Sequence, residues 1–248
     1  MSEVMLVTGG SRGIGAATAI AAARRGFAVC VNYVRGEAAA LQVVAAIEAA
    51  GGRAVAAAGD VASEADVVAL FATVDRLLGA VTALVNNAGI LETQQRVDAM
   101  TATRLNRILA TNVTGPFICA REAILRMSTR HGGNGGAIVN VSSMAARLGA
   151  PGEYVDYAAS KGAIDTLTIG LAREVAAEGI RVNAVRPGLI HTDIHASGGI
   201  PDRVERLKDG VPMRRGGDPA EVASAIMWLL SSEASYVTGA IIDVSGGR

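Results

Sequence analysis

The sequence predicts an α/β fold: one domain, residues 1–248, with a doubly wound parallel sheet of about seven strands and helices on both faces. Apolar runs rich in Val and Ile recur along the chain, and longer helix-compatible stretches separate them. The runs are residues 3–8, 27–33, 53–58, 82–86, 137–142, 180–186 and 240–244. A chain of 248 residues has the length of one large domain with a single core. Such β-α-β units bind ligands beyond the carboxyl ends of their strands, where we therefore expect the site.

The composition suits this fold and excludes two classes of partner. Half of the residues are hydrophobic and only 3% are aromatic, as expected for buried parallel strands under close-packed, Ala-rich helices. Lys plus Arg and Asp plus Glu both number 23. Because there is no excess of positive charge, we expect neither a nucleic acid nor an anionic membrane surface as partner.

The amino-terminal residues predict a cytoplasmic protein. Met1 to Val4 lead directly into the first apolar run, without a basic segment followed by a cleavable apolar one. No apolar run approaches the length that spans a membrane. Cys30 and Cys119 are far apart and have apolar neighbours, which is typical of small core residues in a reducing compartment.

The first loop, residues 8–15 (TGGSRGIG), predicts a phosphate-binding turn. It follows the first strand and opens the first helix, so backbone N–H groups and a helix N-terminus can receive a pyrophosphate. Glycine is needed where the backbone approaches the phosphates closely. Taken alone, the loop could equally be an ordinary tight turn before a helix.

The end of the second strand favours NADP(H) over NAD(H). A carboxylate there would accept hydrogen bonds from the ribose 2′-OH of NAD, yet residues 31–35 (VNYVR) contain no acid. Arg12 and Arg35 could both bind a 2′-phosphate through charge-assisted hydrogen bonds. For Arg35, a solvated loop charge is an equal alternative.

A phenol and an ammonium group supply the central chemical signal. Tyr157 and Lys161 are four residues apart, hence on one face of a helix. Hydride transfer at a carbon requires proton transfer at the attached oxygen, and a phenol near pKa 10 is a poor base at neutral pH. Lys161 and an oxidised nicotinamide would lower the pKa of Tyr157, which could then act as base or acid. Tyr154 lacks such an ammonium partner and is expected to line the substrate cleft.

Residues 188–217 are predicted to form a substrate lid within the domain. This segment is rich in Gly and Pro around a short polar helical stretch, whereas both flanks are strongly periodic. His191, Asp193 and His195 lie there without a metal-binding pattern, so no metal is expected.

Together, these motifs resemble the short-chain dehydrogenase/reductase family over essentially the whole chain. The spacing Thr-Gly-x-x-x-Gly-x-Gly, the segment 87–89 (NAG) and the Tyr157/Lys161 pair occur in the family's order. The resemblance implies a Rossmann-like oxidoreductase that interconverts a carbonyl and a secondary alcohol, with Tyr157 as general acid/base. The expected catalytic residues are Asn112, Ser143, Tyr157 and Lys161. The expected cofactor-binding residues are Gly9, Ser11, Arg12, Gly13, Ile14, Gly15, Arg35, Asp60, Val61, Asn87, Ala88, Gly89, Tyr157, Lys161, Pro187, Gly188, Ile190 and Thr192.

Two of these catalytic assignments have alternatives. The family's serine usually lies one residue nearer to the tyrosine than Ser143 does, so Ser142 or Ser143 could be the catalytic one and a loop insertion would explain the difference. Asn112 resembles the family's helix asparagine that holds a water near the lysine; alternatively, it marks a helix kink.

The substrate and the assembly remain open between several alternatives. The chain looks similar to bacterial 3-oxoacyl-carrier-protein reductases and glucose 1-dehydrogenases, which are usually homotetramers. A 3-oxoacyl thioester or small ketone would fit the first group, and Arg130 and Arg173 resemble residues that dock an acyl carrier protein. A sugar would need hydrogen-bonding groups in the cleft. Those available nearby are Glu153, Asp156, His191 and His195. A non-catalytic NADP(H)-binding sensor or interaction protein is the alternative from another class.

Overall fold

The computed structural model describes residues 3–248, and the first two residues of the predicted domain lie outside the described part. Seven strands form one parallel sheet in the order β3-β2-β1-β4-β5-β6-β7. They are β1 Val4–Val7, β2 Ala28–Tyr33, β3 Arg53–Ala58, β4 Ala83–Asn86, β5 Gly136–Val141, β6 Ile180–Pro187 and β7 Ile241–Val244. The order reverses between β1 and β4, as in a doubly wound sheet. The predicted fold class is therefore confirmed.

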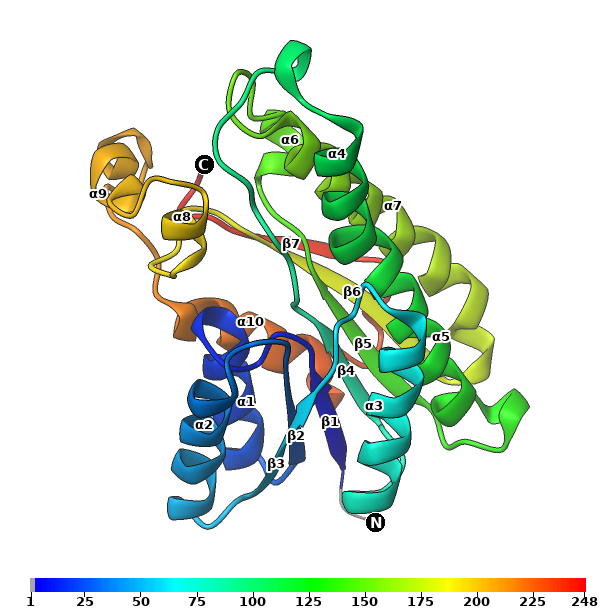
Figure 1. Ribbon diagram of the computed structural model, residues 1–248. Coiled ribbons are helices and arrows are strands. Elements are labelled where there is room, and N and C mark those ends of the chain that lie inside the picture. The colour runs from blue at the N-terminus through cyan, green and yellow to red at the C-terminus, as the bar shows by residue number, and fades with distance from the viewer. Residues whose placement is uncertain (1–2) are drawn as a thin grey trace.

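The helices cover both faces of this sheet (Figure 1). The longer helices are α1 Gly13–Arg24, α2 Glu37–Ala49, α3 Glu64–Leu77, α4 Ala102–Leu109, α5 Gly115–Met127, α7 Val155–Val175 and α10 Pro219–Leu230. Three short ones are α6 Ala145–Leu148, α8 Ile194–Ser197 and α9 Arg203–Leu207. On one face lie α1, α2 and α10, and on the other α3, α5 and α7 (Figure 1).

Alternation along the strands explains the two layers. In β1, Met5 and Val7 pack into the cluster beneath α1 and α10, while Val4 and Leu6 pack into the cluster beneath α3 and α5. All four side chains are buried, because a parallel sheet covered on both faces has no solvent side. The strands therefore consist of continuous apolar runs, which is the pattern that located them in the sequence.

Local signals fix where several helices begin. Ser63 precedes α3, and its hydroxyl accepts a hydrogen bond from the Asp66 N–H at 3.3 Å. Asp218 precedes α10 and forms a capping box with Glu221, and Pro219 occupies the first helical turn. Each cap satisfies N–H groups that the helix itself leaves without an acceptor.

The two cysteines lie in the hydrophobic core. Cys30 and Cys119 are buried free thiols in the cluster beneath α3 and α5. Burial raises the pKa of each to about 12, with Glu122 adding to the rise at Cys119.

Across residues 3–248, every helix is too short or too polar to span a membrane.

The carboxyl ends of the strands face one edge of the molecule and carry the remaining loops. The segments that follow β1, β4 and β5 meet there, and α8 and α9 stand over this edge near the carboxyl terminus (Figure 1). These two helices belong to the segment 188–217, the predicted lid. The fold thus gathers loops that are distant in sequence around a single opening.

Candidate active site

A cavity of about 1250 Å³ opens at this edge. Its walls come mainly from the segments that follow the strands, and they include all the predicted cofactor residues except Gly15. Those that line it are Gly9, Ser11, Arg12, Gly13, Ile14, Arg35, Asp60, Val61, Asn87, Ala88, Gly89, Tyr157, Lys161, Pro187, Gly188, Ile190 and Thr192. Residues predicted from separate motifs therefore share one cavity.

The glycine loop shapes one end of the cavity. Gly13 adopts φ +54°, a left-handed conformation that other residues rarely adopt. Gly15 lies beneath the loop, where a Cβ atom would be 2.4 Å from the Gly9 carbonyl oxygen and 2.6 Å from Asn87 Nδ2. Asn87 Nδ2 also donates to the carbonyls of Thr8 and Gly9, at 3.0 and 2.9 Å. Gly15 thus supports the loop from below, which its sequence pattern alone could not distinguish from lining the cavity.

The start of α1 offers donors to an anion. The first hydrogen bond from this helix runs from the Ala16 N–H to the Arg12 carbonyl at 3.2 Å, so the N–H groups just before Ala16 have no acceptor within the helix. They open the helix at the cavity wall, where the helix dipole favours negative charge. The described residues therefore fit the pyrophosphate of a dinucleotide.

Two guanidinium groups stand where the adenosine end of such a ligand would lie. Arg12 and Arg35 line the cavity, are exposed, and form no ion pair with any described residue. Glu37 is the carboxylate nearest along the chain to the end of β2, and it accepts a hydrogen bond from the Tyr33 hydroxyl at 3.1 Å instead of lining the cavity. At this end of the cavity, the two guanidinium groups follow β1 and β2, and the one carboxylate among the residues that line the wall there, Asp60, follows β3 and accepts a hydrogen bond from the Ala62 N–H at 2.9 Å.

Tyr157 and Lys161 lie on α7 at the far side of the cavity. The Lys161 ammonium is 5.6 Å from the centre of the Tyr157 ring, which places the two side chains on one helix face as their spacing predicts. Lys161 Nζ donates a hydrogen bond to the Val141 carbonyl at 2.8 Å. This bond fixes the ammonium at the carboxyl end of β5.

Burial dominates the electrostatics of this pair. It raises the pKa of Tyr157 to about 12, against a lowering by the hydrogen bond with Ser143. It lowers the pKa of Lys161 to about 8, opposed by the nearby Asp165 carboxylate. The sequence led us to expect a lowered pKa for Tyr157. In the structure the pKa of Tyr157 is instead raised, because desolvation is the largest contribution to it.

The two adjacent serines point in different directions. Ser142 is buried, and its hydroxyl donates to the Lys161 carbonyl at 3.2 Å, on the backbone of α7. Ser143 lines the cavity together with Tyr157, lowers the pKa of the Tyr157 phenol, and accepts a hydrogen bond from the Ala145 N–H at 3.1 Å. Of the two, Ser143 is the hydroxyl beside the phenol.

Asn112 does not line the cavity but lies at an irregular point between two helices. It is fully buried in a π-helical turn, Ala110–Thr114, that joins α4 to α5, so it does mark an irregular helix. Its side chain accepts from the Ile90 N–H at 2.8 Å and donates to the Ile90 carbonyl at 3.0 Å and Ser160 Oγ at 3.1 Å. Asn112 thereby ties the loop after β4 to α7.

Several groups considered for a sugar substrate are engaged elsewhere. The structure corrects the expectation for Asp156, which does not line the cavity but is paired with Arg104 beneath it. His191 lies outside the cavity and lines a separate hollow of about 230 Å³. Glu153 and His195 do line the cavity, yet Glu153 is paired with Arg203 at 2.5 Å and His195 Nε2 contacts the Ile190 carbonyl at 2.9 Å.

The two arginines considered for docking a carrier protein lie away from the cavity. Arg130 and Arg173 are exposed and do not line it, and Arg130 lies 3.9 Å from Glu178. In the part of the chain that the structure describes, no three His, Cys, Asp or Glu side chains gather as metal ligands would. Asp193 and His195 line the cavity as isolated groups.

Sequence reasoning missed the contacts between the lid segment and the cavity rim. Tyr154, which was expected in the cleft, does line it, and its hydroxyl donates to the Gly198 carbonyl at 3.1 Å. The Arg203 guanidinium lies over the Tyr154 ring, 5.3 Å from its centre. Leu91, Leu148 and apolar lid residues complete the wall. No motif marks these residues, because their partners are distant in sequence.

Comparison with known proteins gives consistent matches over nearly the full chain. A family model described as enoyl-(acyl carrier protein) reductase matches residues 9–248. The uncharacterized oxidoreductase YgfF of Escherichia coli (strain K12) is 60% identical over 245 residues, 99% of either chain. The 3beta-hydroxysteroid dehydrogenase 1 of Eggerthella lenta is 40% identical over 246 residues, 99% of this chain and 93% of that protein. A solved short-chain dehydrogenase/reductase from Serratia marcescens BCRC 10948 has a TM-score of 0.90 at 33% identity, covering 99% of this chain and 97% of that one.

Proposed function

The chain belongs to the short-chain dehydrogenase/reductase family, and we propose that it is an NADP(H)-dependent enzyme that interconverts a ketone and a secondary alcohol on an apolar substrate. The family makes it an oxidoreductase with a nicotinamide cofactor and a small-molecule substrate. The observation that carries the proposal is one cavity that holds Tyr157 beside Ser143 and Lys161 at one end and the glycine loop with Arg12 at the other.

In the proposed mechanism, Tyr157 transfers the proton. When bound, the nicotinamide would supply the hydride for reduction and accept it in oxidation. Tyr157 donates its phenolic proton to the carbonyl oxygen in reduction and takes the proton of the alcohol in oxidation. The Ser143 hydroxyl donates a hydrogen bond to the same oxygen as its charge changes. The Lys161 ammonium would hold the ribose hydroxyls of the cofactor, and its positive charge would stabilise the tyrosinate.

The preference for NADP(H) rests on the charges at the adenosine end. Arg12 and Arg35 are exposed at the cavity wall and have no carboxylate partner among the described residues. A 2′-phosphate would give each guanidinium a charge-assisted hydrogen bond, whereas NAD(H) would leave both without a ligand. The end of β2, residues 31–35, carries no acid, so the usual acceptor for the 2′-OH of NAD is missing there.

The substrate end of the cavity favours an apolar ketone or thioester over a sugar. The apolar side chains that line it are Leu91, Met144, Leu148, Tyr154, Ile194 and Leu207. A sugar needs free acceptors and donors, yet the Glu153 carboxylate is held by Arg203 and the Asp156 carboxylate by Arg104. One relative is named for a hydroxysteroid, a secondary alcohol on a large apolar body. That name agrees with the lining of this cavity.

Three further features belong to the proposal. Residues 188–217 close over the substrate as a lid within the single domain, held by the Tyr154 and Arg203 contacts. The chain assembles as a homotetramer, for which exposed apolar side chains such as Tyr236 offer contact area. Arg130 and Arg173 are exposed and could receive an acidic carrier protein if the substrate is carrier-bound.

The test follows the absorbance of NADPH and NADH at matched concentrations against 3-oxoacyl thioesters, bulky apolar ketones, diketones and quinones. Aldoses are run in the oxidative direction with NADP⁺ and NAD⁺. We expect NADPH-linked reduction of an apolar ketone or thioester. Turnover with NADH alone would contradict the cofactor assignment, and turnover of aldoses alone would contradict the substrate class. NADPH binding without any turnover would support the non-catalytic alternative.

A further inference from the structure

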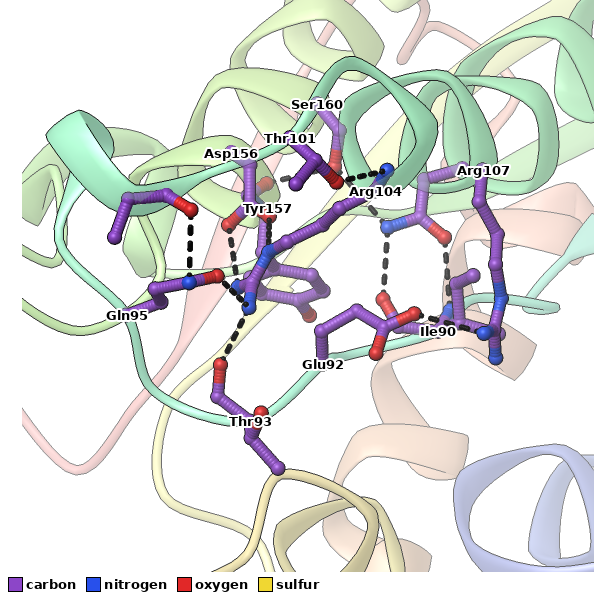
Figure 2. Close-up of polar contacts among 12 residues, drawn as sticks. Ile90, Glu92, Thr93, Gln95, Thr101, Arg104, Arg107, Asp156, Tyr157 and Ser160 are labelled. Atoms are coloured by element: carbon purple, nitrogen blue, oxygen red, sulfur yellow. Dashed lines mark hydrogen bonds and ion pairs between the residues drawn. The ribbon is translucent and has the colours of Figure 1, made fainter.

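An ion pair lies buried directly behind Tyr157, outside the cavity. Arg104 on α4 and Asp156 on α7 are 52 residues apart, and Arg104 Nε lies 2.6 Å from Asp156 Oδ2 (Figure 2). The second guanidinium nitrogen of the fork, Nη2, lies 3.4 Å from Oδ1. Only 10% of the Arg104 side chain and 1% of the Asp156 side chain are exposed. The mechanism described above uses neither residue.

Asp156 connects this pair to the backbone of the proton-transferring residue. Its Oδ1 accepts a hydrogen bond from the Tyr157 N–H at 2.9 Å. Asp156 and Tyr157 lie in the first turn of α7, where N–H groups lack helical acceptors and a negative charge is favoured. The position of the Asp156 carboxylate therefore helps to set the start of the helix from which the Tyr157 phenol projects.

Arg104 connects the same carboxylate to the loop that follows β4. Its Nη1 donates to the Thr93 carbonyl at 2.7 Å and to Gln95 Oε1 at 3.1 Å (Figure 2). The Gln95 N–H in turn donates to the Glu153 carbonyl at 2.9 Å. Residues 87–92, which line the cavity, lead directly into this segment. The guanidinium thus joins the start of α7 to the loop after β4.

Because Arg104 and Asp156 are buried, replacing either side chain should disturb the connection between α7 and the loop after β4. Exposed ion pairs contribute little, because solvent screens them and both side chains remain mobile. A buried pair differs, since removing one partner leaves a charge without compensation in an apolar setting. Both buried groups hydrogen-bond backbone next to the site, Asp156 at the Tyr157 N–H and Arg104 at the Thr93 carbonyl, which supports a role in placement.

We propose that Arg104 and Asp156 are positioning residues that hold Tyr157 at a fixed distance from the loop after β4, whose residues 87–92 line the cavity. The inference rests on the proposed function, because it assigns to the pair the alignment of that enzyme's acid/base. Asn112 makes the corresponding tie one helical turn further along, through Ile90 and Ser160 (Figure 2). Ser160 Oγ donates to the Tyr157 carbonyl at 2.7 Å, so both ends of the Tyr157 backbone are held.

The test compares Arg104→Met with Arg96→Met. Arg96 also pairs with an aspartate, Asp98, but the two side chains are 77% and 68% exposed and neither residue lines the cavity, so this change is a matched control for loss of an ion pair in the loop after β4. The first readout is hydrogen exchange, which does not depend on activity. We expect faster exchange at residues 90–96 and 153–157 in Arg104→Met, with exchange in β2 and β3 unchanged, and no change in Arg96→Met.

The second readout separates positioning from folding. We expect Arg104→Met to lower kcat by about tenfold to a hundredfold, as misplacement of a catalytic group does, while the Kd for NADPH changes by less than about twofold. Arg104→Lys, which keeps the charge but not the fork, should recover part of kcat. Arg104→Met/Asp156→Asn should lose about as much kcat as either single change, because the two residues act as a unit.

The outcomes distinguish this inference from the proposed function. Unchanged exchange, or unchanged kcat in a folded Arg104→Met protein that turns over ketones in its parent form, would overturn the positioning role alone. If Arg104→Met fails to fold, Arg104→Lys carries the same two readouts. Faster exchange in a protein whose parent shows no NADPH-linked turnover would support the mechanical link and contradict the proposed function.

Discussion

The two halves of the molecule build their shares of the cavity by different means. In the half from β1 to α3, residues 4–77, the buried polar side chains are Thr8, Thr18 and Asn32, none of which is charged. Its contribution to the cavity comes mainly from the backbone of the glycine loop and the start of α1. In the half from β4 to β7, the buried groups include four charged side chains, Glu122, Asp156, Lys161 and Asp165. The first half therefore presents backbone donors and exposed charged groups to the cavity, and the second presents the buried Tyr157 and Lys161.

This difference predicts which property each half controls. Backbone donors and exposed guanidinium groups can bind a cofactor but have no proton to transfer near neutral pH. Buried phenol and ammonium groups can move protons, because their pKa values respond to burial and to neighbouring charges. Changes in the first half should alter cofactor affinity, and changes in the second should alter turnover with cofactor affinity retained.

The largest effect on cofactor affinity is expected from Gly15→Ala. The added Cβ would lie 2.4 Å from the Gly9 carbonyl oxygen, so the loop must move. We expect the Kd for NADPH to rise by about a hundredfold and the protein to lose roughly 1–3 kcal/mol of stability. The measurements are NADPH fluorescence titration and chemical denaturation.

Gly170→Ala is the matched control for that change. Gly170 lies in α7, where an added Cβ would meet nothing within 4 Å. Alanine there should stabilise the helix by about 0.5–1 kcal/mol without altering NADPH affinity. If Gly15→Ala bound NADPH as tightly as Gly170→Ala, the loop would not have the supporting role assigned to it.

Arg12→Ala tests the charge at the adenosine end. We expect it to weaken NADPH binding by about tenfold to a hundredfold while NADH binding changes little, since only NADPH offers a 2′-phosphate. Arg24→Ala, at the other end of α1 and also exposed, should leave both affinities unchanged. Equal losses for NADPH and NADH would show that Arg12 contacts the shared part of the cofactor.

The pH dependence of carbonyl reduction tests the role of the buried titratable groups, Lys161 and Tyr157. Burial lowers the pKa of Lys161 to about 8, so the ammonium is present below that pH and lost above it. Tyr157 stays protonated throughout, because burial raises its pKa to about 12. We expect kcat/KM for reduction to be level below pH 8 and to fall up to about tenfold per pH unit above it. A level profile to well above that pH would contradict a role for the charged lysine.

The smallest effect is expected at the lid. Tyr154→Phe removes the hydrogen bond to the Gly198 carbonyl but keeps the ring beneath Arg203. Loss of one hydrogen bond of about 1 kcal/mol should raise KM for the ketone by about fivefold, with kcat and NADPH affinity unchanged. Steady-state kinetics with and without the change measure this. An unaltered KM would mean that this contact does not hold the lid over the substrate.

The same contrast explains what could be predicted from the sequence. The sheet and the glycine loop depend on local patterns: continuous apolar runs, and glycines between a strand and a helix. Tyr157 and Lys161 were also readable, because four residues on a helix are neighbours. The shared cavity followed, since the carboxyl ends of parallel strands meet at one edge.

The remaining parts depend on contacts between residues that are distant in sequence. Asp156 was expected in the cleft, but its pairing with Arg104, 52 residues away, turns it into the scaffold behind Tyr157. Ser142 and Ser143 could not be separated by spacing, because the direction of each hydroxyl depends on how β5 meets α7. The lid contacts of Tyr154 likewise involve Gly198, in a segment without periodicity.

The most direct test of the central claim is Tyr157→Phe, measured for both turnover and NADPH binding in one preparation. The change removes only the hydroxyl that moves the proton. We expect kcat for the best ketone of the panel to fall by about a thousandfold and the Kd for NADPH to change by less than about twofold. Turnover near that of the parent protein would contradict Tyr157 as the acid/base, and with it the proposed mechanism.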